Sequence, residues 1–322
     1  MAEPVLEMRG VTKRFRISGE NSLFGKTFDA VRDVSLSVMP GETFGIVGES
    51  GCGKSTLARL LMCLEVPSEG EILFKGQRVD NLREGRRRSL RPRFQMVFQD
   101  SGSSLNPRKR VADILREPML YHLKKDKKWV DDRVDALMDM VGLPAAMKER
   151  YPHEFSGGQR QRICIARALS LNPDVVILDE PVSALDVSVQ AQILNLLRDL
   201  QERLSLTYVF IGHGLGAVHY MSHRIAVMYM GRVVEMGPSD TLFDRPAHPY
   251  TKALLDAAPV ADVALRDRER LQMKGELDLK AEAGCCPLMP RCPYACDACR
   301  HDGIALRSAD GRLTACDRLL RD

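Results

Sequence analysis

The sequence contains no long apolar run. No stretch approaches the roughly 18 consecutive apolar residues that a membrane-spanning helix needs, and the first residues lack the basic-then-apolar order of a signal peptide. A net charge of only +4 is too small to indicate binding to nucleic acid. Internal repeats and low-complexity segments are also absent, which excludes a repeat protein. We therefore expect a protein of the cytosol, or one held at a membrane by its partners.

Cysteine is scarce over most of the chain and crowded at its end. Of nine cysteines, six fall between positions 285 and 316. In a reducing cytosol such crowding indicates metal binding rather than disulfides. The apolar content of 44% and charged content of 28% are those of a globular protein, and 322 residues can hold one large α/β core with a smaller appended unit.

Strand-like and helix-like patterns alternate along the chain. Apolar runs typical of strands lie at residues 31–38, 43–47, 71–74, 175–178, 208–211 and 225–230. Helical periodicity is present at 130–141, 160–169 and 187–203. A parallel sheet interrupted by a helical insertion is the simplest arrangement. We therefore expect a core formed by residues 1–98 and 171–238, a helical unit at 99–170, and an extension at 239–322.

A glycine-rich loop follows the strand predicted at 43–47 and precedes a helix predicted at 55–63. Its glycines let backbone N–H groups turn inward around phosphate oxygens, and the helix directs its positive end toward them. We expect Lys54 to reach the β and γ phosphates of a nucleotide, and Ser55 to offer its hydroxyl to Mg²⁺. The predicted phosphate-binding residues are Gly48, Glu49, Ser50, Gly51, Cys52, Gly53, Lys54, Ser55 and Thr56.

Cys52 occupies a variable position of this loop. Because it lies near a helix N-terminus, we expect its thiol to be reactive and its alkylation to block nucleotide binding.

An acidic pair ends the strand predicted at 175–178. Asp179 would point its carboxylate at the Mg²⁺ beside the Ser55 hydroxyl, and Glu180 would lie near the attacking water as the general base. Acidic pairs at strand ends are common, but in a chain with a phosphate loop this pair favours nucleotide hydrolysis.

A second glycine turn heads the helix predicted at 160–169. It consists of Ser156, Gly157, Gly158 and Gln159. Ser156 can cap the helix, and the exposed N–H groups with the positive end of the dipole form a second anion site. Alone, these four residues usually mean only a helix cap. In order with the other two motifs, they suggest ATP sandwiched between two subunits.

Together the three motifs resemble those of the ATP-binding subunit of an ABC transporter, and the resemblance covers nearly the whole chain. It implies a P-loop NTPase (RecA-like) α/β core with an inserted α-helical subdomain and a small cysteine-rich C-terminal extension. It also implies that Gln99 and the switch histidine His213 act in catalysis with Glu180 and Lys54, and that Gln99 lies beside Mg²⁺.

The resemblance implies two further nucleotide contacts. Asp186 closes the Ser-Ala-Leu-Asp loop that follows the acidic pair. Phe15 matches the aromatic position that stacks on adenine in this family.

Within the superfamily, the chain is most similar to importers of dipeptides, oligopeptides and nickel. Residues 98–107, 179–192 and 248–254 carry this similarity. Residues 91–110 and 151–169 look more like the second of the two ATPase subunits that such importers usually have, which implies a heterodimer rather than a homodimer. The resemblance thus implies ATP-driven import of di- and oligopeptides, with nickel or another small solute as the alternative.

The implied partners are a second ATPase subunit, two membrane-spanning permease subunits and, indirectly, an extracytoplasmic solute-binding protein. The chain would lie peripherally at the cytoplasmic face of the inner membrane. A soluble ABC ATPase acting on nucleic acid or ribosomes is a competing class, but such proteins usually carry two cassettes or long coiled-coil arms. A metal- or redox-sensing tail that controls the ATPase is a third hypothesis.

Two places depart from the family pattern. The family usually has Ser-His-Asp around the switch histidine, whereas Gly212 and Gly214 flank His213 here. Loss of the carboxylate is expected to loosen the subunit contact near His213. Beside Gln99, the sequence from Asp100 is Asp-Ser-Gly-Ser instead of the usual Asp-Pro-Tyr-Ala, so transmission to the membrane partner is expected to be tuned differently.

The cysteine spacing resembles that of the C-terminal extension of many peptide-importer ATPases. The resemblance implies a [4Fe–4S] cluster held by Cys286, Cys292, Cys299 and Cys316. Cys296 and Cys299 could equally supply a tetrahedral zinc pair. An empty or redox-labile thiol cluster also stays open, because spacing alone rarely fixes the metal.

Overall fold

The computed structural model describes residues 3–17, 26–258, 271, 273, 275, 285–300 and 305–316. In the first half of the chain the elements are β1 (Leu6–Ile17), β2 (Lys26–Val38), β3 (Thr43–Val47), α1 (Lys54–Leu61), β4 (Glu69–Phe74), β5 (Gln77–Arg78), α2 (Glu84–Leu90), β6 (Phe94–Val97), α3 (Ser101–Ser104), α4 (Val111–His122), α5 (Lys127–Met140) and α6 (Gly157–Leu169). The second half adds β7 (Val175–Asp179), α7 (Val187–Leu204), β8 (Thr207–Gly212), α8 (Leu215–Met221), β9 (Arg224–Tyr229), β10 (Arg232–Pro238), α9 (Ser239–Asp244), α10 (Pro249–Ala257), β11 (Arg307–Ala309) and β12 (Arg312–Thr314). None of the helices described is both long and apolar enough to cross a membrane.

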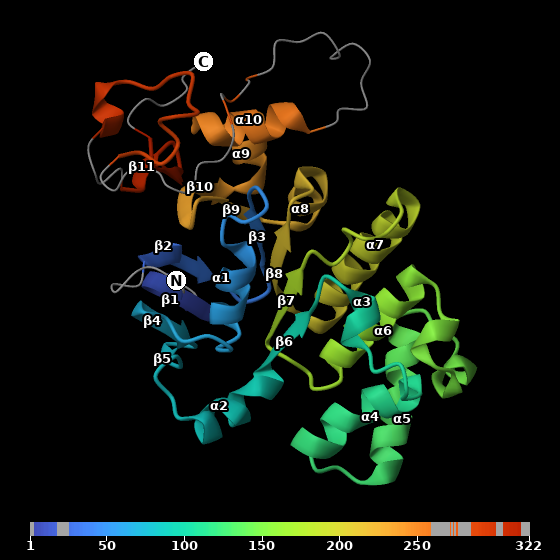
Figure 1. The fold of residues 1–322 in the computed structure, drawn as a ribbon. Coiled ribbons are helices and arrows are strands. Elements are labelled where there is room, and N and C mark those ends of the chain that lie inside the picture. The colour runs from blue at the N-terminus through green and yellow to red at the C-terminus, as the bar shows by residue number, and fades with distance from the viewer. Residues whose placement is uncertain are drawn as a thin grey trace.

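An eight-stranded sheet forms the centre of the molecule (Figure 1), in the order β11-β12-β10-β9-β3-β8-β7-β6. From β6 to β9 neighbouring strands are parallel, and β3, β7 and β8 are buried along their whole length, which explains why their side chains are almost all apolar. The strands predicted at 43–47, 175–178, 208–211 and 225–230 are confirmed. The sheet is mixed rather than wholly parallel, because β9 turns back into antiparallel β10 through Met230 and Gly231, both with positive φ.

A second sheet, wholly antiparallel, was not predicted. It has the order β2-β1-β4-β5 and takes in the strands predicted at 31–38 and 71–74. Apolar side chains of β1 and β2 pack in one cluster with α1 and with strands of the main sheet. This layer fixes α1, and with it the end of the glycine-rich loop, against the main sheet.

A helical lobe is inserted between β6 and β7 and lies on the right of Figure 1. It contains α3 to α6, and the predicted helices at 130–141 and 160–169 appear there as α5 and α6. The helix predicted at 187–203 is α7. Buried side chains of α4 to α7 join those of the neighbouring strands in one cluster, so the lobe packs directly onto the sheet.

The extension expected from residue 239 adds two strands to the main sheet. β12 pairs with β10, and β11 pairs with β12. On β10, the fully buried Glu235 carboxylate accepts the backbone N–H groups of Ala247 and His248, at 2.9 and 3.0 Å, and lies 3.5 Å from the Arg312 guanidinium. One buried carboxylate thus joins the start of α10, the last strand pair and the core sheet. Residues 265–280, where charged side chains and a helical pattern favour a helix, lie outside the described residues, apart from 271, 273 and 275.

Candidate active site

The glycine-rich loop lies between β3 and α1, at the carboxyl end of a parallel strand. The Lys54 ammonium is buried and donates to the backbone carbonyls of Gly48 and Glu49, at 2.7 and 2.9 Å. Gly53 precedes the helix at φ 107°, and a Cβ there would lie 2.2 Å from the Ala30 carbonyl oxygen, so only glycine fits. Ser55 is exposed at the start of α1 and Thr56 is half-buried.

The structure contradicts the expected reactivity of Cys52. Its side chain is only 2% exposed and its sulfur lies 3.9 Å from Lys54 Nζ. Burial raises the pKa of the thiol, and the Lys54 charge opposes that rise only in part. The helix N-terminus alone does not make this thiol a nucleophile, because the loop wraps over it.

The acidic pair stands at the end of β7, as predicted. Burial, and then the neighbouring Glu180 carboxylate, raise the pKa of Asp179, while the Lys54 ammonium lowers it. A buried carboxylate in this setting is suited to a cation held against it. Glu180 adopts φ 47°, an uncommon conformation for a residue other than glycine, and its N–H donates to the Ile211 carbonyl of β8.

Three residues predicted to be catalytic meet at the Glu180 carboxylate. Gln99 Nε2 lies 2.8 Å from Glu180 Oε2, and His213 Nδ1 lies 3.1 Å from the same oxygen. Gln99 comes from the loop after β6 and His213 from the loop after β8, so neighbouring parallel strands deliver all three side chains to one edge. Both contacts use Oε2, which leaves Oε1 to accept a proton from a water.

The second glycine turn forms the predicted helix cap at the start of α6. Ser156 Oγ accepts the Gln159 N–H at 3.3 Å, and Gln159 Oε1 accepts the Ser156 N–H at 3.0 Å, a reciprocal capping box. Gly157 lies over Leu185, and at Gly158 a Cβ would come within 2.5 Å of a Val189 methyl. The turn is therefore held against the first turn of α7 and the loop that leads into it.

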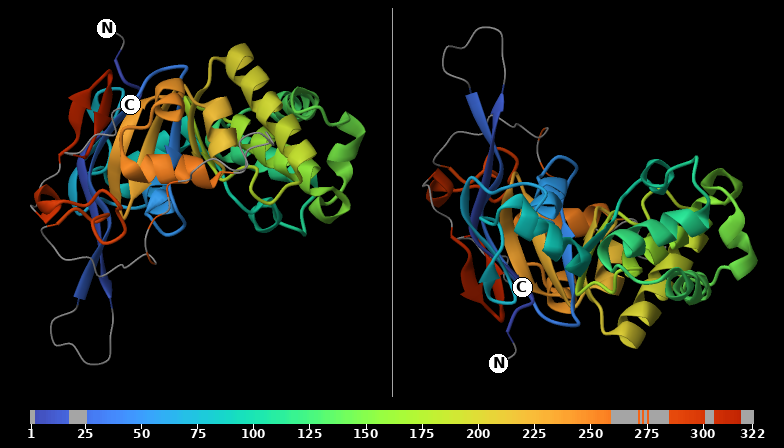
Figure 2. Two further views of the ribbon diagram at one scale, coloured as in Figure 1. Left: turned by 90° about the horizontal axis from the view of Figure 1, so that it is seen from above. Right: turned by 90° about the horizontal axis from the view of Figure 1, so that it is seen from below.

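This turn does not share a site with the glycine-rich loop of its own chain. It belongs to the helical lobe, whereas α1 lies against the other part of the molecule (Figures 1 and 2). Asp186, predicted to contact the nucleotide, is the N-cap residue of α7, and Val187 beside it is 82% exposed. Phe15 is 38% exposed on β1, with the Lys13 ammonium 5.1 Å from its ring centre. Its ring therefore lies at the surface and does not belong to the hydrophobic core.

The two glycines around His213 differ in their surroundings. A Cβ at Gly212 would approach a Val218 methyl at 3.0 Å, whereas a Cβ at Gly214 would meet nothing within 4 Å. The position where the family usually has aspartate therefore has room for one. Asp100 caps the short α3 through the N–H groups of Gly102 and Ser103. The Ser103 hydroxyl, and then these two N–H groups, lower the pKa of the Asp100 carboxyl by hydrogen bonding.

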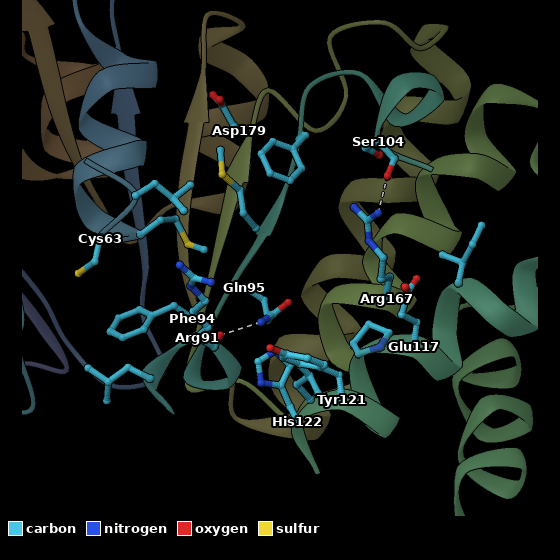
Figure 3. Close-up of a pocket in the computed structure, with 18 of the residues that line it drawn as sticks. Cys63, Arg91, Phe94, Gln95, Ser104, Glu117, Tyr121, His122, Arg167 and Asp179 are labelled. Carbon is cyan, nitrogen blue, oxygen red and sulfur yellow. Dashed lines mark hydrogen bonds between the residues drawn. The ribbon is translucent and has the colours of Figure 1, made fainter. Parts of the chain in front are cut away.

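A cavity of about 990 Å³ opens between the β6 region and the helical lobe (Figure 3). Arg91, Phe94 and Gln95 line it from one side, and Glu117, Tyr121 and His122 of α4 line it from the other. Exposed apolar side chains contribute to its walls, namely Leu64, Phe98 and Tyr121. Gln99 and Asp179 also line the cavity, which therefore reaches the catalytic edge of the sheet.

The cysteine segment, residues 285–300, packs against the core rather than standing apart. Leu288 is buried, and Cys286 and Cys292 pack against the same apolar cluster. The Cys286 N–H donates to the Cys299 carbonyl at 2.8 Å. Within the described part of the chain, however, no three His, Cys, Asp or Glu side chains are grouped as metal ligands, so the structure does not confirm the predicted metal site.

The structure also shows two contacts to the glycine-rich loop that the sequence did not suggest. The Glu49 N–H donates to the Tyr250 hydroxyl at 2.9 Å, and the Glu49 carboxylate pairs with Arg291 at 3.1 Å. The partners are 201 and 242 residues away in the chain. No local pattern predicts such pairs, although both residues lie in stretches that the resemblance had singled out.

Two family models match the chain. One described as ABC transporter covers residues 31–183, and one described as Oligopeptide/dipeptide transporter, C-terminal region, covers residues 234–299. Among curated relatives, an oligopeptide transport ATP-binding protein of Bacillus subtilis is 49% identical, with 92% of both chains covered. A dipeptide transport ATP-binding protein of Haemophilus influenzae is 46% identical, with 97% of this chain and 96% of the relative covered. A solved dimeric bacterial ABC transporter cassette is 28% identical with a TM-score of 0.64, over 73% of this chain and 98% of that one.

Proposed function

The chain belongs to the ABC transporter family, and we propose that it is the ATP-hydrolysing subunit of an importer for di- and oligopeptides. The observation that carries the proposal is the presence of an ABC cassette and an oligopeptide/dipeptide transporter C-terminal region in one chain. Relatives named for oligopeptide and dipeptide transport, at 49% and 46% identity over nearly full length, support the same substrate class.

We assign the role of general base in ATP hydrolysis to Glu180. Its Oε1 takes a proton from water as the water oxygen bonds to the γ-phosphorus and the bond from γ-phosphorus to the β–γ bridging oxygen breaks, leaving ADP. Gln99 and His213 hold the carboxylate through Oε2. Lys54 would bind the β and γ phosphates, and Ser55, Gln99 and Asp179 would hold the Mg²⁺ that arrives with ATP.

The site is completed by a second ATPase subunit. The N–H groups of the Ser156–Gln159 turn lie in the helical lobe, away from the phosphate loop of the same chain, so each nucleotide takes its second anion site from the partner. Asp186 lies at the exposed start of α7 and contributes to this contact, while Phe15 stacks on adenine. A heterodimer with a related subunit is the arrangement we propose.

Two permease subunits are the membrane partners, and the cavity of Figure 3 is where we place their contact. Its exposed apolar walls suit a protein segment, and Gln99 connects it by one hydrogen bond to Glu180. The chain would then be peripheral at the cytoplasmic face of the inner membrane. In domain terms, we propose residues 1–98 and 171–238 as the RecA-like core, 99–170 as the helical subdomain and 239–322 as the importer extension.

Uptake of labelled peptide tests the substrate class. In proteoliposomes that contain the complete transporter and its solute-binding protein, we expect a labelled oligopeptide to accumulate only with internal ATP. Unlabelled di- and oligopeptides should compete, and Ni²⁺ should not. ATP-dependent nickel accumulation that peptides fail to reduce would contradict peptide import while leaving the ATPase assignment intact.

For the cysteine segment we propose a [4Fe–4S] cluster held by Cys286, Cys292, Cys299 and Cys316, with zinc as the alternative. Burial, and then mutual charge with nearby thiols including Cys299, raise the pKa of Cys286 and Cys292. Thiolates this close together repel one another, and a bound metal ion offsets that repulsion. The crowding of these cysteines is therefore compatible with a metal centre. When bound, the cluster supplies an electron-transfer or structural centre, and no step of ATP hydrolysis passes through it.

Metal analysis of protein purified without oxygen tests the cluster. We expect about four irons and four acid-labile sulfides per chain, both lost in Cys286→Ser. Cys63→Ser, outside the segment, should retain them. Stoichiometric zinc, or no metal, would contradict the iron–sulfur proposal.

A further inference from the structure

Glu49 of the phosphate loop is held by the C-terminal region through two of its groups. Its backbone N–H donates to the hydroxyl of buried Tyr250 on α10, at 2.9 Å. Its carboxylate receives both arms of the Arg291 guanidinium, Nη1 to Oε2 at 3.1 Å and Nη2 to Oε1 at 3.4 Å. Bidentate pairing of this kind fixes the relative orientation of the two side chains as well as their distance. The conformation of the phosphate loop therefore depends on contacts from the C-terminal region as well as on the loop's own residues.

Arg291 is itself fixed by its surroundings. Its side chain is only 13% exposed, and Nη1 also lies 3.5 Å from the Tyr229 hydroxyl at the end of β9. Its backbone N–H donates to the carbonyl of buried Leu288, and the next residue, Cys292, donates to the same carbonyl. The guanidinium thus holds a position set by the fold of the cysteine segment and by the core sheet.

The backbone carbonyl of Glu49 contacts Lys54, the residue expected to bind the nucleotide phosphates. The carbonyl oxygen accepts the Lys54 ammonium at 2.9 Å, beside the Gly48 carbonyl at 2.7 Å. A shift of residue 49 therefore moves one of the two carbonyls that place the Lys54 charge. Arg291, Glu49 and Lys54 form one connected path from the cysteine segment to the phosphate-binding charge.

We propose that Arg291 is a positioning residue for ATP binding, which orients the phosphate loop through the Glu49 carboxylate. The cysteine segment that carries Arg291 thereby becomes part of the nucleotide site, although it supplies no group that touches ATP. The inference rests on the proposed role of the phosphate loop, and the variants below separate the two.

ATP affinity of the full-length chain, measured with a fluorescent ATP analogue and Mg²⁺, tests the positioning role. Arg291→Met is expected to raise Kd about 2- to 5-fold, the upper part of the range for an ion pair that is not fully buried, while kcat at saturating ATP in the assembled transporter stays within about twofold. Arg300→Met is the matched control, because Arg300 lies in the same segment but is exposed and, within the part of the chain that the structure describes, pairs with exposed Asp297, 3.6 Å away. It should bind like the wild type.

A double-mutant cycle separates positioning through Glu49 from other effects. Once Glu49→Gln has removed the carboxylate, adding Arg291→Met should change Kd less than about 1.5-fold. Arg291→Lys keeps the charge but cannot form the bidentate pair, so its Kd for the ATP analogue should stay at least about twofold above the wild-type value. If Arg291→Met fails to fold by circular dichroism, Arg291→Lys and Glu49→Gln carry the comparison.

Wild-type affinity in Arg291→Met, full recovery in Arg291→Lys, or an unchanged Arg291→Met effect in the Glu49→Gln background would each overturn the positioning role. Lys54→Ala reports on the phosphate loop itself. If the wild type fails to bind ATP, or Lys54→Ala binds it equally well, the proposed site is wrong. If Lys54→Ala loses binding while Arg291→Met keeps it, only the role of Arg291 is wrong.

Discussion

Replacing Glu180 by Gln is expected to lower ATP turnover by about 10²- to 10⁴-fold, the usual contribution of a general base. An amide cannot take the proton of the attacking water, yet it keeps the size of the side chain and can still meet Gln99 and His213 at one oxygen. ATP affinity should therefore remain close to the wild-type value. The measurement is phosphate release by the assembled transporter at saturating ATP, with Kd determined separately.

Two comparisons make this result specific to the base. Glu202→Gln, on the exposed side of the C-terminal turns of α7, should leave turnover unchanged. Asp179→Asn should lose Mg²⁺-dependent affinity as well as turnover, because Asp179 is assigned to the cation rather than to the water. Near wild-type turnover in Glu180→Gln would overturn the assignment of the base.

Removal of the buried Glu235 carboxylate is expected to destabilise the fold by about 3–5 kcal/mol, the usual cost of truncating one partner of a buried ion pair. Glu235→Ala leaves Arg312, 7% exposed, without its buried counter-charge and removes the acceptor of the Ala247 and His248 N–H groups. The result should appear as a lower urea midpoint in circular dichroism. Glu235→Gln, which keeps an acceptor, should lose less.

Glu202→Ala provides the matched surface comparison, with an expected change within about 0.5 kcal/mol. An equally small change in Glu235→Ala would mean that the last strand pair and the start of α10 are not held by this carboxylate. It would also weaken the view that the C-terminal extension and the core are one packed body.

The strands and helices that carry the nucleotide chemistry could be predicted because their signals are local. The run at 43–47 is fully buried and, apart from Thr43, carries no polar side chain, and the reciprocal cap between Ser156 and Gln159 spans only four residues. Gln99 and His213 were predicted to be catalytic only from the family resemblance. Their meeting with Glu180 is explained by one rule, that parallel strands bring their carboxyl ends to the same edge.

The parts that were not predicted depend on pairing between distant segments. An alternating or apolar run does not say which sheet it joins, so the strands at 31–38 and 71–74 were placed in the wrong one. The burial of Cys52 depends on how the loop wraps, which its helix-terminal position does not reveal. The pairing of Glu49 with Arg291 spans 242 residues and leaves no periodic signal.

Each chain carries the phosphate loop of one ATP site and the Ser156–Gln159 turn of another, so each site is complete only when two subunits meet. This claim is tested most directly by the mass of the Glu180→Gln chain in solution, mixed with its ATPase partner, with and without ATP and Mg²⁺. We expect particles of two ATPase subunits with ATP and of one subunit without it, and no ATP effect when Lys54→Ala is added. Single subunits at saturating ATP, in a mixture shown to bind the nucleotide, would contradict the account.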